Sequence, residues 1–134
     1  MKAQRTARWA TIMTKWLITK MAARPKWQLV SFLGPAGSES RGIVDLMAIR
    51  KDHSTHGAVL NRGDLFELIL IQVKGGNAAW PSSNDVRRLR QVAKHHRADG
   101  IVLAAWTQGR QPALYRLPSK GNNWAAVTPE ELFA

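Results

Sequence analysis

The ten residues from Glu67 to Gly76, ELILIQVKGG, constrain the fold more than any other part of the sequence. A short run of branched apolar residues that ends in two glycines is typical of a buried β-strand. Because side chains alternate between the faces of a strand, Leu70, Gln72 and Lys74 point one way and the residues between them point the other. The pattern therefore predicts an amide and an ammonium side by side, followed by glycines that let a ligand approach the backbone.

The remaining periodicities predict an α/β fold. Apolar spacings of three and four predict a helix over 5–22 with a core-facing stripe of Trp9, Ile12, Met13, Trp16, Leu17 and Met21. Strands are expected over 27–33, 43–50, 67–75, 101–107 and 113–117, with helices over 82–98 and 128–133. The order α-β-β-β-α-β-β, with no repeat or linker, predicts a single domain over residues 1–134 with a central mixed sheet flanked by helices.

The charge of the chain indicates its class of partner. Lysine and arginine number 20 against nine acids, which gives a net charge of +11, and residues 1–38 contain seven bases and no acid. Such a field attracts polyanions, and nucleic acid is the leading candidate. Two alternatives stay open: a basic surface without a polyanion partner, and an organellar transit peptide at the acid-free N-terminus.

The chain contains no cysteine, which excludes disulfides, thiolate metal sites and cysteine nucleophiles. This composition fits a reducing cytoplasmic location. The longest apolar runs are far shorter than a membrane span, so no membrane association is expected.

A second strand places a carboxylate beside the first motif. If the strands that flank the long connection over 51–64 are antiparallel neighbours with Arg50 opposite Glu67, then Asp45 lies opposite Gln72. One carboxylate, one amide oxygen and Lys74 then converge at one end of the sheet.

Asp45 in GIVDLMAIR, followed by Gln72-Val73-Lys74 at the end of a hydrophobic strand, resembles the PD-(D/E)XK nuclease superfamily, and within it the small Holliday-junction-resolvase-like members. Their motif is an aspartate on one strand and an acid, any residue and a lysine on the next, within an α-β-β-β-α-β core. The resemblance covers roughly residues 5–117. It implies a restriction-endonuclease-like fold and a metal-dependent endonuclease that cuts branched or duplex DNA.

The resemblance also implies a role for each site residue. Asp45, Gln72 and the Val73 carbonyl would hold Mg²⁺ or Mn²⁺ through oxygen ligands. Lys74 would position or activate the attacking water and stabilise charge on the scissile phosphate. Junction-cutting members usually pair, so a homodimer is an open alternative.

Two residues depart from the family pattern. Gln72 stands where the family usually has an acid, and its amide oxygen contributes no charge to a metal site. The first helix contains no acid, whereas resolvase-like members often supply a glutamate there, and Glu39 on the preceding loop is the available substitute.

Cations and one tryptophan are predicted to contact nucleic acid. Trp80 follows the glycines and can stack on an unpaired base. The cations expected to contact phosphates are Arg5, Arg8, Arg41, Lys74, Arg87, Arg88, Arg90 and Lys94.

Other interpretations of the same residues remain open. Asp45 and Lys74 can form a purely structural ion pair. The protein can be a non-catalytic nucleic-acid-binding protein on a decayed nuclease fold, or a basic RNA-binding domain of the translation apparatus. The HxxH spacing of His53 and His56 is a weak zinc signal, because no cysteine accompanies it.

Overall fold

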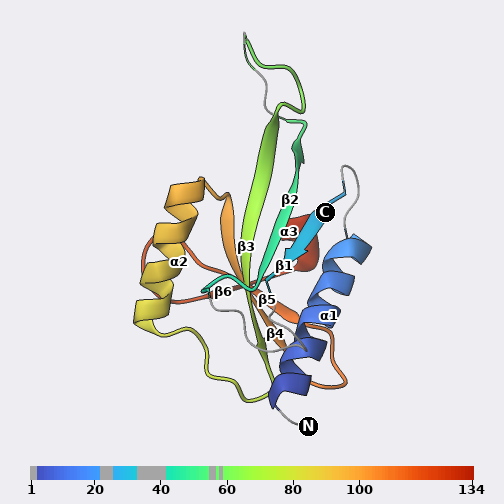
Figure 1. Cartoon of the computed structure of the whole chain (residues 1–134), viewed down its shortest axis with the longest axis vertical. Helices are drawn as coiled ribbons and strands as arrows, with labels where there is room; N and C mark the ends of the chain where they lie inside the picture. Colours follow the sequence, from blue (N-terminus) through green and yellow to red (C-terminus); the bar gives the residue numbers. More distant parts are fainter. Residues whose placement is uncertain (1–2, 22–25, 33–41, 55–56, 58) are drawn as a thin grey trace.

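The structure is a computed structural model that describes residues 3–21, 26–32, 42–54, 57 and 59–134, with the backbone alone at residues 3–5. A six-stranded mixed sheet is flanked by helices (Figure 1), which confirms the predicted α/β class. The elements in chain order are α1 (Ala3–Met21), β1 (Gln28–Ser31), β2 (Leu46–Asp52), β3 (Leu65–Gly75), α2 (Ser83–His96), β4 (Gly100–Trp106), β5 (Ala113–Arg116), β6 (Ala125–Val127) and α3 (Pro129–Phe133). The predicted order is thus confirmed, with β6 as an additional strand.

The strands lie side by side in their sequence order. The pair β3–β4 is parallel and is connected through α2, because parallel strands need a long crossover, while the other neighbouring pairs are antiparallel. Strands β2 and β3 pair as far as Asp52 and Leu65, and their hairpin projects beyond the helices (Figure 1). This pairing shortens the connection that was expected over 51–64.

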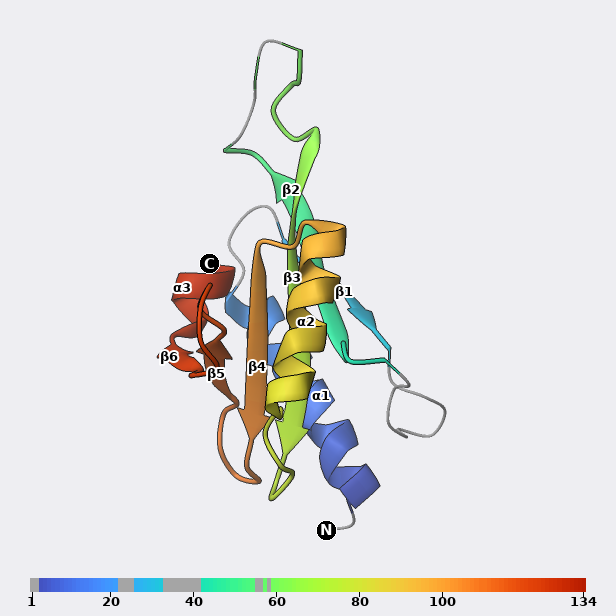
Figure 2. The same cartoon turned by 90° about the vertical axis from the view of Figure 1, so that its left-hand side faces the viewer.

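The helices cover opposite faces of the sheet (Figures 1 and 2). The core on the α1 face contains Leu17, Ile18, Trp27, Leu46, Ala48, Ile69, Ile71, Val102, Ala104, Leu114 and Phe133. The core on the α2 face contains Val86, Leu89, Ile101 and Leu117. Since Ile69 and Ile71 belong to the α1 core, the alternate residues Gln72 and Lys74 lie on the α2 face, as the strand pattern predicts.

The buried stripe of α1 differs from the predicted one. Trp9, Ile12 and Trp16 are 44%, 41% and 46% exposed, whereas Ala10, Thr11, Thr14, Leu17 and Ile18 are buried. Hydrophobicity alone favoured the tryptophans, but the small residues allow the helix to lie close to the sheet. The Thr14 hydroxyl is satisfied there by donating to the Ala10 carbonyl at 2.7 Å.

Gly75 is the point of closest approach between α1 and β3. A Cβ built on it would lie 2.9 Å from Thr6 Cγ2 and 3.1 Å from Ala10 Cβ. The space that the sequence assigned to a ligand at this glycine is therefore taken by α1. Gly76 has a φ of +60°, which glycine adopts without strain.

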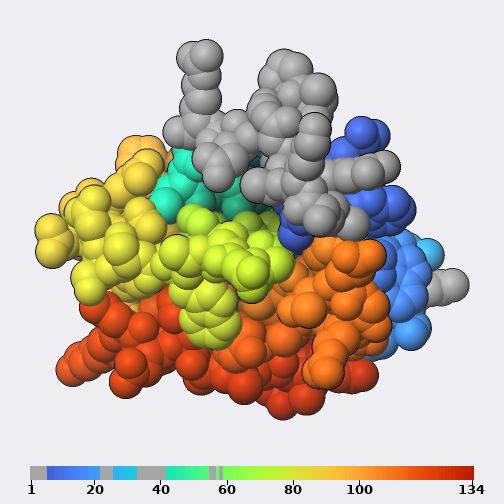
Figure 3. Space-filling model, turned by 90° about the horizontal axis from the view of Figure 1, so that it is seen from below, coloured from blue at the N-terminus to red at the C-terminus, as the bar shows by residue number. Residues whose placement is uncertain are grey.

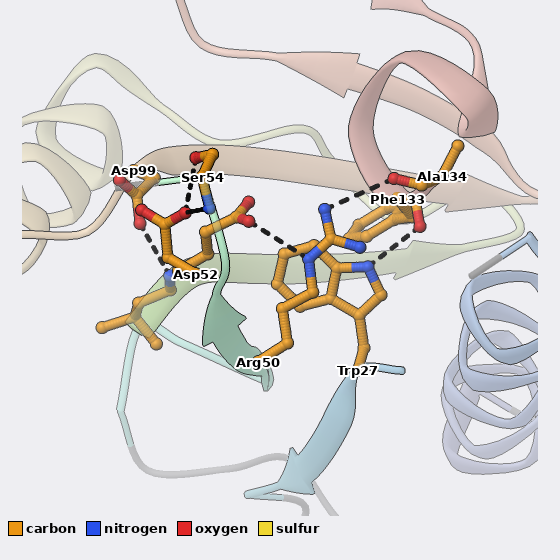
Figure 4. Close-up of polar contacts among 9 residues, drawn as sticks. Trp27, Arg50, Asp52, Ser54, Asp99, Phe133 and Ala134 are labelled. Carbon is orange, nitrogen blue, oxygen red and sulfur yellow. Dashed lines mark hydrogen bonds and ion pairs between the residues drawn. The ribbon is translucent and has the colours of Figure 1, made fainter. Parts of the chain in front are cut away.

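The C-terminal helix is held against the strands by an aromatic cluster (Figure 4). The Trp27 indole donates to the Phe133 carbonyl at 3.0 Å, and their rings meet edge to face at 5.6 Å. The Arg50 guanidinium lies 4.2 Å above the Trp27 ring and donates to the Ala134 carbonyl at 3.3 Å. These contacts fix α3 on the α1 face.

None of the helices in the described ranges combines the length and the apolar character needed to cross a bilayer.

Candidate functional site

Asp45 lies at a bulge directly before β2, not inside a strand over 43–50 as predicted. Its backbone N–H donates to the Ile71 carbonyl at 3.0 Å, while Leu46 is also paired with Ile71. Two residues of one strand therefore oppose one residue of the other, which is the arrangement that re-aims side chains at strand ends. The Asp45 carbonyl accepts from the Phe32 N–H at 2.9 Å, so the bulge is tied to both neighbours.

The bulge directs the Asp45 carboxylate to β3. Its Oδ2 accepts a hydrogen bond from the backbone N–H of Val73 at 2.8 Å. The assumed pairing of Arg50 with Glu67 is confirmed, but the regular continuation that would set Asp45 opposite Gln72 is replaced by the bulge. The predicted antiparallel pairing of these two strands is confirmed, and the carboxylate contacts the backbone of the residue between Gln72 and Lys74.

Gln72 is the most unusual polar residue of this region. It is only 6% exposed, and its side-chain oxygen is buried without a hydrogen-bond partner. Leaving a buried acceptor unsatisfied costs about 1–3 kcal/mol. An oxygen in this state is suited to a ligand that accepts its lone pairs, such as a cation or a hydrogen-bond donor.

The backbone of Val73 adds an oxygen on the same side as Asp45. In a strand, the N–H and C=O of one residue point to the same side, and the Val73 N–H points to Asp45. The carboxylate, the Val73 carbonyl and the Gln72 amide are all hard oxygen donors of the type that Mg²⁺ prefers. This donor set fits such a cation.

Lys74 is half-buried on the α2 face, and its charge acts on the carboxylate of Asp85. Asp85, in the first turn of α2, has a pKa below its ordinary value of 3.8, chiefly because the Ser82 backbone N–H donates to it at 3.1 Å. The Ser82 hydroxyl and the charges of Lys74 and Arg88 lower the pKa further. The sequence indicated Asp85 only as a helix cap, and its position beside Lys74 depends on how α2 packs.

The structural ion pair proposed for Asp45 and Lys74 is not formed. Arg50 pairs with Glu67 at 3.3 Å and Arg88 pairs with Asp85 at 3.9 Å, and Lys74 takes part in neither of these ion pairs.

The outer surface of α2 presents the predicted basic face. A groove of about 320 Å³ is lined by Ser83, Arg87, Arg90, Gln91, Lys94 and Asn122. Arg87, Arg88 and Lys94 are exposed, whereas Arg90 donates to the Pro118 carbonyl at 2.8 Å and to the Gly121 carbonyl. Arg90 therefore fastens the loop after β5 in addition to lining the groove.

Arg8 and Trp80, two other predicted contact residues, do not line this groove. Arg8 is exposed on α1, and Trp80 is half-exposed, with its ring meeting that of Tyr115 edge to face at 4.7 Å. Arg5 lies in α1, in the part where only the backbone is described. Glu39 and Arg41 lie outside the described residues.

No cluster of three or more histidine, aspartate or glutamate side chains suited to a metal occurs among the described residues, His53 included. His56 lies outside them. Among the described residues, a cation at this place would therefore have the Asp45 carboxylate and neutral oxygens as ligands, and substrate phosphates can complete the shell of Mg²⁺.

No protein-family model matches the chain, and no curated protein or solved structure is significantly similar to it.

Proposed function

We propose that the protein is a Mg²⁺- or Mn²⁺-dependent endonuclease that hydrolyses phosphodiester bonds in DNA. The observation that carries the proposal is the buried, unpartnered oxygen of Gln72, one residue from the backbone amide that binds Asp45. The order α1-β1-β2-β3-α2-β4, with Lys74 at the end of β3, supports the resemblance to the PD-(D/E)XK superfamily.

Each residue has a defined task in this proposal. Asp45, the Gln72 oxygen and the Val73 carbonyl would hold the cation, which supplies Lewis-acid stabilisation of charge on the phosphate. The Lys74 ammonium orients the attacking water and stabilises the negative charge that develops on the phosphate oxygens. The water oxygen bonds to phosphorus as the P–O bond to the leaving sugar oxygen breaks, and that oxygen gains a proton.

The basic face of α2 supports nucleic acid as the substrate class. Its exposed cations Arg87, Arg88 and Lys94 lie on the helix whose first turn adjoins Lys74. A phosphate backbone that follows this helix reaches the end of β3. The net charge of +11 supports a polyanionic substrate of this kind.

A second candidate function is non-catalytic nucleic-acid binding on the same fold. It is favoured by the absence of a three-acid cluster in the described residues and by the hydrogen bond that already engages Asp45. In that case Asp45 stabilises the bulge and Gln72 is the remnant of a metal site.

A cleavage assay separates the two candidates. Supercoiled plasmid, branched, duplex and single-stranded DNA are incubated with purified protein and Mg²⁺ or Mn²⁺. We expect wild-type protein to cut at least one of these DNAs, and Lys74→Ala and Asp45→Asn to abolish cutting. Lys51→Ala, an exposed lysine near the hairpin end of β2, is the matched control and should leave the rate unchanged. Wild-type protein that binds these DNAs but cuts none of them with either cation would favour the binder.

A further inference from the structure

A pocket lies between α1 and the turn that joins β4 to β5. It has a volume of about 440 Å³ and is lined by Trp9, Met13, Trp106, Gln108, Gly109 and Arg110. We call this cavity the Trp9 pocket. Pockets of this size accommodate small ligands or the anchoring group of a larger one. Its existence follows from the orientation of α1, which turns Trp9 away from the core.

The chemistry of the Trp9 pocket matches a nucleotide. Trp9 is about half-exposed and offers a flat aromatic face, while Trp106 is buried. The exposed residues on the turn are Gln108, whose amide can bond a base edge, and Arg110, whose guanidinium can bond a phosphate. Bases stack on tryptophan irrespective of their sequence, because every base has a π-face.

The pocket lies at the same end of the sheet as Lys74, on the opposite face. Trp106 is paired with Gly75, the residue after Lys74, and the Trp106 carbonyl accepts from the Gly76 N–H at 2.9 Å. Figure 3, which views the molecule from this end, shows α1, the β3–α2 loop and the β4–β5 turn side by side. A strand that rounds this end of the sheet can contact both sites.

We propose that the Trp9 pocket binds an unpaired nucleobase of single-stranded nucleic acid, so that the protein holds a single-stranded segment beside the candidate site. This inference rests on the proposed function and deepens it, because it names an unpaired nucleobase as the part of the substrate that the protein binds. The charge of the surroundings selects this occupant over a second copy of the chain. Arg110 and Arg8 are exposed near Trp9, and two molecules of net charge +11 would bring like charges together here.

The test compares two tryptophans that share one helix. Trp9 and Trp16 are 44% and 46% exposed, but only Trp9 lines the pocket. Affinities of wild type, Trp9→Ala, Trp9→Phe and Trp16→Ala are measured by fluorescence anisotropy for a 12-mer of thymidine and for a 12-base-pair duplex. Trp9→Ala should weaken single-strand binding about 5- to 100-fold. It should leave duplex binding unchanged, Trp9→Phe should retain most of the single-strand affinity, and Trp16→Ala should behave as wild type.

The outcomes separate this inference from the proposed function. Equal losses for Trp9→Ala and Trp16→Ala, or equal losses on single strand and duplex, would overturn the nucleobase site while leaving the endonuclease proposal standing. Sedimentation velocity of the same variants gives a further check. A wild-type dimer that both alanine variants dissociate would assign this face of α1 to a subunit interface and overturn the site. Wild-type protein that binds neither oligonucleotide would overturn both proposals. Thermal melts establish that each variant is folded. Arg110→Ala, which leaves α1 unchanged, should also weaken binding of the single strand.

Discussion

At the scale of single residues, Gln72 combines a cost in stability with the proposed role of a metal ligand. Its oxygen is buried without a partner, yet an apolar residue of similar length would fit the same space without that cost. Proteins keep such groups where function requires them, and a cation that accepts the lone pair would offset the cost. Stability measurements on Gln72 variants therefore test the proposed metal site without depending on cleavage.

Gln72→Glu should make the protein respond more strongly to Mg²⁺. Without metal the buried carboxylate is poorly solvated, which raises its pKa and lowers the free energy of unfolding near neutral pH. With metal it becomes a charged ligand, so the melting temperature should rise with Mg²⁺ concentration more than it does for wild type. Metal binding should be tighter than in wild type, and cleavage should be retained or increased. A scanning-fluorimetry titration with MgCl₂ makes the comparison.

Gln72→Met is the contrasting variant and Leu70→Met on the same face of β3 is its control. Gln72→Met removes the unsatisfied oxygen, so we expect it to raise the free energy of unfolding by about 1 kcal/mol without metal and to abolish any Mg²⁺ response. Leu70→Met should change stability little and keep the wild-type response. If Gln72→Met and wild type respond identically to Mg²⁺, Gln72 is not a ligand.

The site also indicates what a sequence can predict at this scale. The pairing of Arg50 with Glu67 was an assumption about the register, which the structure confirms, and Asp45 contacts β3 through the Val73 amide. The bulge at Asp45 could not be predicted, because it depends on backbone hydrogen bonds to Phe32 and Ile71 at once. The proximity of Asp85 to Lys74 depends on the packing of α2, which no local pattern encodes.

At the scale of elements, α1 shows why an apolar stripe does not by itself identify the buried face. Of the predicted stripe, Leu17 is buried and Met21 packs against the core, whereas Trp9, Ile12 and Trp16 are exposed. Close contact with Gly75 requires small residues at Thr6 and Ala10, and this contact rotates Trp9 and Trp16 outward. The strands and helices themselves were predictable from periodicity, but β6 was not, because three residues are too few for a pattern.

Gly75→Ala tests the close contact between α1 and β3. The added methyl group would lie 2.9 Å from Thr6 Cγ2 and 3.0 Å from the Thr6 carbonyl oxygen, so the helix must shift. We expect a loss of about 1–3 kcal/mol in the free energy of unfolding, which is typical of overpacking. Gly100→Ala is the matched control in β4, where the nearest atom would be Arg116 Nε at 4.0 Å. Urea denaturation gives the free energy of unfolding of both variants. If the two values are equal, the packing of α1 on β3 does not require glycine at position 75.

At the scale of the whole molecule, exposed cations lie on two separate surfaces, the outer face of α2 and the projecting β2–β3 hairpin. The α2 groove contains Arg87 and Lys94, while Lys51 and Arg62 lie on the projecting β2–β3 hairpin. All four side chains are exposed, and all contribute equally to the net charge. If the attraction to DNA is nonspecific, both pairs of cations contribute to binding. If the phosphate backbone lies along α2, binding depends on Arg87 and Lys94 alone.

The salt dependence of DNA binding distinguishes these two cases. Each phosphate contact that is removed lowers the slope of log K against log salt by about 0.9 for duplex DNA. The double variant Arg87→Gln/Lys94→Gln should therefore reduce the slope by about 2 and weaken binding to all sequences alike. The double variant Lys51→Gln/Arg62→Gln removes the same charge from the hairpin and should leave the slope near that of wild type.

Arg90 is kept in both variants. It holds Pro118 and Gly121 through hydrogen bonds, so its replacement could destabilise the fold and weaken binding for that reason alone. Anisotropy titrations of one duplex at several salt concentrations provide the slopes. Equal reductions in the two double variants would show that net charge, and not the face of α2, attracts the DNA.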